Sequence, residues 1–163
     1  MYTICFVEDE KDLSNLIKVY LEKAGYKVVT FNKGADAIDY IGQPVDVWIL
    51  DIMLEDDISG YDIIKEIRKN NSNVPVIFTS ARDQEIDKIL GLELGSDDYI
   101  TKPYSSKELV LRVNNIIKRV YKKEEKQEKK KKEKIKKSNK VEKNSRFGNC
   151  PFLNKKEHKI FFF

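Results

Sequence analysis

Acidic, hydroxyl and lysine side chains follow short apolar segments of the sequence, each at the C-terminal end of its segment. These groups are Glu8-Asp9 after residues 3–7, Asp51 after residues 45–50, Ser80 after residues 75–79 and Lys102-Pro103 after residues 98–101. In an open parallel sheet, ligands bind beside the carboxyl ends of the strands. If the apolar segments are parallel strands, the polar groups converge on one edge of the sheet.

These residue types are the ones that transfer of a phosphoryl group to an aspartate requires. A carboxylate oxygen of Asp51 can attack phosphorus as a nucleophile, but the nucleophile and the donor phosphate are both anionic. Mg²⁺ prefers hard oxygen ligands, so Glu8, Asp9 and Asp51 together can hold an ion that reduces this repulsion. Lys102 can place a positive charge near a phosphoryl oxygen, and the Ser80 hydroxyl can donate a hydrogen bond to another.

The elements that must position these groups alternate between strand-like and helical patterns up to about residue 120. The strand-like segments are residues 3–7, 27–31, 45–50, 75–80 and 98–102. Between them, apolar residues recur at helical spacing. A short second helix is predicted over residues 34–41, and the fifth helix opens with the capping-box pattern Ser105-Ser-Lys-Glu108. Alternating strands and helices predict an α/β fold with a parallel, doubly wound sheet.

Charge is distributed unevenly along the 163 residues. Residues 121–146 contain 13 Lys or Arg and 5 Glu, a net charge of +8, and residues 147–163 add +2. Because the whole chain carries +4, residues 1–120 carry −6. We therefore expect a folded domain over residues 1–120, a Lys/Glu-rich linker over 121–146 and an incomplete second domain over 147–163. The linker is expected to be a solvated, flexible tether, with loose nucleic-acid contact as the alternative.

The chain shows no sequence pattern of a secreted or membrane protein. Cys5 and Cys150 form neither a disulfide framework nor a zinc-binding spacing. No apolar run approaches the roughly 20 residues of a membrane helix, and the N-terminus lacks the features of a signal peptide. A cytoplasmic location without a membrane partner is therefore expected.

Five motifs resemble the receiver domain of bacterial two-component response regulators, the CheY-like family. They are Val7-Glu-Asp-Glu10, Leu50-Asp-Ile-Met-Leu54, Ser59-Gly-Tyr-Asp62, Thr79-Ser-Ala-Arg82 and Gly95-Ser-Asp-Asp-Tyr-Ile-Thr-Lys-Pro103. The resemblance covers residues 1 to about 120 and implies a five-stranded, flavodoxin-like sheet with strand order 2-1-3-4-5. It also implies a phosphorelay in which a sensor histidine kinase is the partner and Mg²⁺ the cofactor. A receiver is not an enzyme beyond its own self-catalysed phosphorylation and dephosphorylation.

The resemblance assigns roles to the polar residues at the predicted sheet edge. It makes Asp51 the phosphoacceptor and assigns Mg²⁺ to Glu8, Asp9, Asp51 and the backbone carbonyl of Met53.

A second set of roles concerns the response to phosphorylation. The resemblance makes Ser80, followed by the small Ala81, the switch hydroxyl. It makes Tyr99 the switch aromatic residue and Lys102 the phosphate-sensing lysine, and it implies a cis peptide bond before Pro103.

The loop after Asp51 departs from the family pattern. The family usually has a proline four residues and a glycine eight residues after the phosphoacceptor. Here Glu55 replaces the proline and Gly60 comes nine residues after Asp51, so the loop is one residue longer and more acidic. Asp56 and Asp57 lie in this loop, and its expected flexibility argues against them as phosphoacceptors. Metal affinity or acyl-phosphate lifetime is expected to differ from the family norm.

The predicted output face, made by the fourth helix, fifth strand and fifth helix, carries charges of both signs. Its residues are Lys88, Leu92, Glu93, Asp97, Asp98, Glu108, Val110, Arg112 and Arg119. This set resembles the OmpR/PhoB subfamily, whose activated receivers dimerise through this face, and implies a homodimer on activation. The alternative is an ordinary solvated face with internal ion pairs, each contributing less than about 1 kcal/mol.

The same subfamily carries a C-terminal winged-helix DNA-binding domain. Residues 147–163 resemble only its first strands, so the lineage is transcriptional but no sequence-specific DNA binding is expected of this chain. One alternative is a truncated, output-less or dominant-negative regulator. A phosphatase of the haloacid dehalogenase type is a distant alternative, because it needs a second aspartate where Met53 stands.

Overall fold

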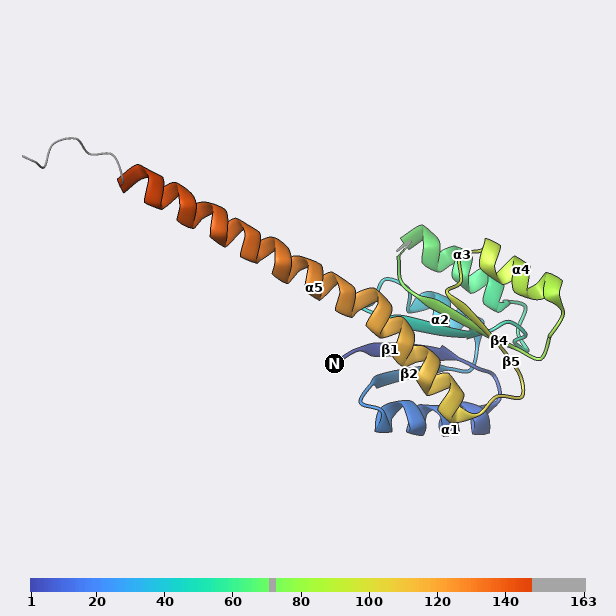
Figure 1. Ribbon diagram of the computed structural model, residues 1–163. Coiled ribbons are helices and arrows are strands. Elements are labelled where there is room, and N and C mark those ends of the chain that lie inside the picture. Colours follow the sequence, from blue (N-terminus) through green and yellow to red (C-terminus); the bar gives the residue numbers. More distant parts are fainter. Residues whose placement is uncertain (71–72, 148–163) are drawn as a thin grey trace, which may run out of the picture. The chain divides into compact units, whose positions relative to one another are not determined.

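The computed structural model describes residues 1–70 and 73–147 of the chain. Within these residues, five strands alternate with five helices (Figure 1). The strands are β1 (Thr3–Val7), β2 (Lys27–Phe31), β3 (Val47–Asp51), β4 (Val76–Ser80) and β5 (Asp98–Thr101). The helices are α1 (Lys11–Lys23), α2 (Gly34–Asp39), α3 (Gly60–Asn70), α4 (Glu85–Glu93) and α5 (Ser106–Phe147). The chain divides into two compact units, Met1–Val120 and Tyr121–Phe163.

The strands of the first unit form one parallel sheet in the order β2-β1-β3-β4-β5. This arrangement confirms the predicted doubly wound α/β fold and its strand order. In the register of the sheet, Val7 pairs with Leu50, and Asp51 pairs with Thr79. The carboxyl ends of β1, β3 and β4 therefore lie side by side, so the residues at or just beyond these ends share one edge.

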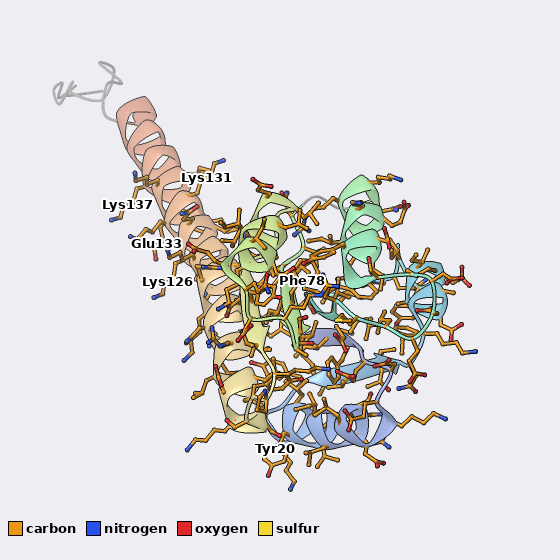
Figure 2. The ribbon with its side chains drawn as sticks, turned by 90° about the vertical axis from the view of Figure 1, so that its right-hand side faces the viewer. Tyr20, Phe78, Lys126, Lys131, Glu133 and Lys137 are labelled. Carbon is orange, nitrogen blue, oxygen red and sulfur yellow. The ribbon has the colours of Figure 1, made fainter. Side chains whose placement is uncertain are left out.

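Both faces of the sheet are covered by helices, as the nearly continuous apolar strands predict. Figure 1 shows α1 and the start of α5 on one face, with α3 and α4 on the other. The α3 residues Ile63, Ile64 and Ile67 belong to one buried core cluster with strand residues such as Phe78. Phe78 lies inside the first unit in Figure 2. Full burial of such a side chain stabilises the fold by roughly 1.5–3 kcal/mol.

The N-terminus of α3 is fixed by a reciprocal cap next to the predicted site. The backbone N–H of Ser59 donates to Asp62 Oδ2 over 2.9 Å, and the N–H of Asp62 donates to Ser59 Oγ over 3.3 Å. Hydrogen bonds from Ser59 lower the pKa of Asp62, so its side chain stays charged at this helix start. The cap sets where α3 begins, directly after the loop that follows Asp51.

Two helices differ in length from the sequence prediction. Helix α2 ends at Asp39 rather than at residue 41. Helix α5 continues to Phe147, where a flexible tether was expected over residues 121–146. Lys and Glu have high helix propensity, and Glu128 and Glu133 each have a lysine four residues later, which favours a helix without a buried face.

The part of α5 in the second unit carries basic side chains all around the helix. Lys126, Lys131, Glu133 and Lys137 point away from the helix axis in Figure 2, and these side chains are exposed. The role of residues 121–146 as a linker stays a prediction. The predicted winged-helix start covers residues 147–163, and all of these beyond Phe147 lie outside the described part of the chain. No helix in the described part of the chain has the length and apolarity needed to span a membrane.

Candidate functional site

Three carboxylates meet at the carboxyl edge of the sheet. Glu8 directly follows β1, and Asp51 is the last residue of β3; because these strands are neighbours, the two side chains are brought together. Glu8 is fully buried, Asp51 is 3% exposed and Asp9 is half-buried. One carboxylate oxygen from each of the three lies within 4.8 Å of the others. The sequence prediction that these groups converge therefore holds in the fold.

Lys102 pairs with the two buried carboxylates. Lys102 Nζ lies 2.8 Å from Glu8 Oε2 and 2.8 Å from Asp51 Oδ2. Its backbone N–H donates to the Ser80 carbonyl over 2.7 Å, which fixes the segment after β5 beside the end of β4. The Lys102–Pro103 peptide bond is cis.

Burial and charge shift the ionisation of this cluster. Burial, together with the charge of nearby Asp51, raises the pKa of Glu8 to about 7, although the hydrogen bond from Lys102 opposes the shift. Burial alone would lower the pKa of Lys102, but hydrogen bonds to Asp51 and Glu8 outweigh it and raise that pKa. The lysine therefore stays charged, while Glu8 gains and loses its proton near neutral pH.

The cluster has the chemistry of a divalent cation site. With the carboxylates ionised, three negative charges lie close together and one ammonium group pairs with two of them, which leaves an excess of negative charge at this edge. All the acidic ligand atoms are oxygens, the type that Mg²⁺ prefers. The residues present therefore fit the predicted metal ion.

The backbone after Asp51 holds its carboxylate in a defined orientation. The N–H of Met53 donates to Asp51 Oδ1 over 3.0 Å, while Oδ2 faces Lys102. Gly60 packs so closely that a Cβ atom there would lie 2.5 Å from the Asp51 carbonyl oxygen. The start of α3 thus presses on the end of β3, and this contact requires glycine.

The predicted switch residues are linked by backbone and side-chain bonds. Ser80 is buried, and its hydroxyl accepts the N–H of Arg82 over 3.1 Å. The Tyr99 hydroxyl donates to the Arg82 carbonyl over 2.9 Å, and burial raises the pKa of Tyr99. Ala81, between Ser80 and Arg82, is exposed. The end of β4, the loop after it and β5 therefore form one bonded unit.

The predicted dimer face is covered largely by ion pairs within the chain. Arg112 lies 3.0 Å from Asp98 and 2.8 Å from Glu108, and Arg119 lies 3.4 Å from Asp97. The other members of the face are the exposed Lys88, Leu92 and Glu93 and the half-buried Val110. These pairs are of the kind that the sequence left as the alternative to a dimer contact, and the use of this face in a dimer stays a prediction.

Sequence reasoning missed two residues near the site. Tyr104 follows the cis proline, and burial, followed by the charge of Glu8, raises its pKa; an aromatic residue directly after Lys-Pro was the available signal. Asp56, expected to lie in a flexible loop, is instead fixed by hydrogen bonds to the N–H groups of Gly34 and Ala35. Sequence reasoning did not find these hydrogen bonds, because Gly34 is 22 residues away from Asp56 in the sequence and leaves no local signal.

Comparison with known proteins identifies the family of the first unit. Residues 4–114 match the response regulator receiver domain family. The chain is 51% identical over 121 residues to the transcriptional regulatory protein CssR of Bacillus subtilis, an overlap of 74% of this chain and 53% of CssR. It is 42% identical over 122 residues to the response regulator SaeR of Staphylococcus aureus, covering 75% of this chain and 53% of SaeR. The chain thus spans about half the length of these curated relatives.

Solved structures give the same result. The receiver domain of the Francisella response regulator 1452 matches with a TM-score of 0.69 and 38% identity, over 73% of this chain and 98% of that one. DrrB, described as a Thermotoga maritima OmpR/PhoB homolog, matches with a TM-score of 0.67 and 32% identity, over 73% of this chain and 54% of that one. The chain therefore belongs to the two-component response regulators through its receiver domain, which is a regulatory domain with transcription-regulator relatives and not a catalytic enzyme.

Proposed function

We propose that Asp51 accepts a phosphoryl group from a cognate sensor histidine kinase. The observation that supports this most directly is the environment of its carboxylate: Oδ1 accepts the Met53 N–H, and Oδ2 faces Lys102 beside two further acidic groups. In the transfer, an Asp51 oxygen forms a bond to phosphorus while the bond from phosphorus to the donor imidazole nitrogen breaks. The product is an acyl phosphate.

Glu8, Asp9 and Asp51, with the backbone carbonyl of Met53, would hold Mg²⁺. The bound ion supplies charge neutralisation between the carboxylates and the phosphoryl oxygens. Lys102 stays charged and lies 2.8 Å from Asp51, so it can contact a phosphoryl oxygen once the transfer has occurred. The protein thus acts chiefly by positioning and charge neutralisation.

The signal would leave the site through Ser80 and Tyr99. A phosphoryl group at Asp51 attracts the Ser80 hydroxyl, and movement of Ser80 disturbs its bond with the Arg82 N–H. Because Tyr99 bonds to the carbonyl of the same Arg82, its ring responds to that movement. The α4-β5-α5 face would then exchange internal ion pairs for contacts with a second copy, since a two-fold dimer needs a self-complementary patch.

A role in transcription is proposed from the likeness to the curated relatives. CssR is named a transcriptional regulatory protein, and by this likeness we propose that this chain belongs to a pathway that regulates transcription and that it acts in the cytoplasm. An output-less regulator would accept phosphate at the same site and would differ only in lacking a DNA response. Phosphorylation of Asp51 is therefore the property that both versions of the proposal share.

Labelling with acetyl phosphate tests the proposal. With Mg²⁺ present, the wild type is expected to gain the mass of one phosphoryl group, while Asp51→Asn gains none. The matched control is Asp57→Asn, an exposed loop position that should label like the wild type. Unchanged labelling of Asp51→Asn would contradict the proposal.

A further inference from the structure

The long loop after Asp51 is attached to α2, the helix that follows β2 in the chain. Asp56 Oδ2 accepts the N–H of Gly34 over 2.7 Å and the N–H of Ala35 over 3.3 Å. These are the first amide groups of α2, whose own N-cap residue, Lys33, provides no side-chain cap. The carboxylate of Asp56 thus supplies from the β3–α3 loop the cap that α2 otherwise lacks.

Close packing accompanies these hydrogen bonds. A Cβ atom at Gly34 would lie 2.7 Å from Ile58 Cγ2, so the loop approaches α2 at a distance that only glycine permits. Ile58 itself packs against the buried core cluster. At its far end the loop is closed by the Gly60 N–H, which donates to the Ile52 carbonyl over 3.1 Å. The loop therefore has a defined conformation despite its extra residue.

The same loop contributes directly to the phosphoacceptor site. It contains Met53, whose N–H orients Asp51 Oδ1. It also forms one wall of a crevice of about 300 Å³ that reaches Asp9. The residues lining this crevice are Asp9, Lys11, Asn32, Lys33, Glu55 and Asp56. A shift of the loop would consequently move both the Met53 peptide and the surroundings of Asp9.

We propose that Asp56 is a positioning residue for the Asp51 site. By fixing the β3–α3 loop to α2, it holds the Met53 peptide where its N–H orients Asp51 and its carbonyl can reach the cation. This inference rests on the proposed function of Asp51. Groups that orient metal ligands typically change metal affinity by about 10-fold or more when removed.

The test compares Mg²⁺ affinity, measured by calorimetric titration, across variants of the full chain. Asp56→Ala is expected to bind Mg²⁺ about 10-fold more weakly than the wild type. Asp56→Asn should recover most of the affinity, because its amide oxygen can accept the same two N–H groups. The NH₂ group replaces Asp56 Oδ1, which has no hydrogen-bond partner among the described residues, so no hydrogen bond is lost at that position. Asp57→Ala removes one exposed acidic group from the same loop and should match the wild type.

Thermal melting separates positioning from simple helix capping. If Asp56 only caps α2, Asp56→Ala lowers the melting temperature without Mg²⁺ but keeps the wild-type affinity, and the inference is wrong. Gly34→Ala gives a second variant should Asp56→Ala not fold: its Cβ displaces Ile58 while every charge remains, and weaker Mg²⁺ binding is again expected. A Gly34→Ala protein with unchanged affinity would also count against the inference.

The wild type and Asp56→Ala together distinguish a failure of the Asp51 assignment from a failure of the Asp56 role. If the wild type itself neither binds Mg²⁺ nor labels on Asp51, the proposed function is wrong. If the wild type does both and Asp56→Ala behaves like Asp57→Ala, only the positioning role is wrong.

Discussion

Glu8 and Asp51 lie almost fully out of solvent, and Lys102 is the cation that pairs with both. Removal of Lys102, or of the two carboxylates, would leave the remaining charge without a partner in a buried site and would lower the stability of the fold. The arrangement therefore holds two acidic groups close together beside the half-buried Asp9. At this scale the site is a set of charges that favours a further cation, and the raised pKa of Glu8 makes that preference depend on pH.

Mg²⁺ binding is expected to weaken as the pH falls through about 7, because Glu8 then takes up a proton that the cation must displace. Without a bound cation, the stability of the fold depends on pH in the opposite direction. The folded-state pKa of Glu8 lies above its ordinary value of 4.5, so its contribution to stability is present below that value and is lost as the pH rises through about 7. Calorimetric titration from acidic to alkaline pH measures the first effect.

Glu8→Gln provides the control for this pH dependence. Its Mg²⁺ affinity should be lower than that of the wild type at alkaline pH and should change less between pH 6 and pH 8, on either side of the wild-type pKa of about 7. A wild-type affinity that stays constant over this range would show that Glu8 is not a ligand that must lose a proton.

At the scale of elements, β4, β5, α4 and α5 join the site to the predicted output face. Gly91 of α4 lets the helix lie close to the aromatic rings below it: a Cβ atom there would be 3.2 Å from both Phe78 and Tyr99. Tyr99 in turn bonds to the loop after Ser80. A change at Ser80 can therefore reach α4 through packed rings, and reach α5 through the ion pair between Asp98 and Arg112.

Arg112→Ala tests the use of this face. In the monomer its ion pairs with Asp98 and Glu108 are partly exposed, so the free energy of unfolding should fall by less than about 1 kcal/mol. Dimerisation of the beryllofluoride-treated protein, followed by sedimentation velocity, should be lost, because Arg112 would contribute to the partner contacts. Lys18→Ala, which removes a cation from α1, should dimerise like the wild type. An Arg112→Ala protein that still dimerises fully would rule out this use of the arginine.

At the scale of the whole molecule, the chain divides into the receiver unit, Met1–Val120, and the unit Tyr121–Phe163. The receiver fold and the convergence of Glu8, Asp9, Asp51 and Lys102 could be predicted, because strand period and strand ends are local signals in the sequence. The hydrogen bond between Asp56 and α2 could not be predicted, because Gly34, its partner, is distant in the sequence. The extension of α5 was also missed, because Lys and Glu propensity gives no apolar period to detect.

The receiver unit should work without the rest of the chain. A protein containing residues 1–120 keeps every residue of the site and the buried core of the first unit. We expect its melting temperature and its rate of labelling by acetyl phosphate to match those of the full chain, as scanning calorimetry and intact-mass measurement can check. A large loss of either would mean that residues 121–163 stabilise the receiver.

The position of the phosphoryl group tests the central claim most directly. After acetyl phosphate treatment with Mg²⁺, borohydride reduction marks the phosphorylated aspartate, and peptide sequencing by mass spectrometry locates it. The mark is expected on Asp51, and it should be absent when Mg²⁺ is removed with a chelator. A mark on Asp56 or Asp57, or on no residue at all, would contradict the assignment of Asp51 as the phosphoacceptor.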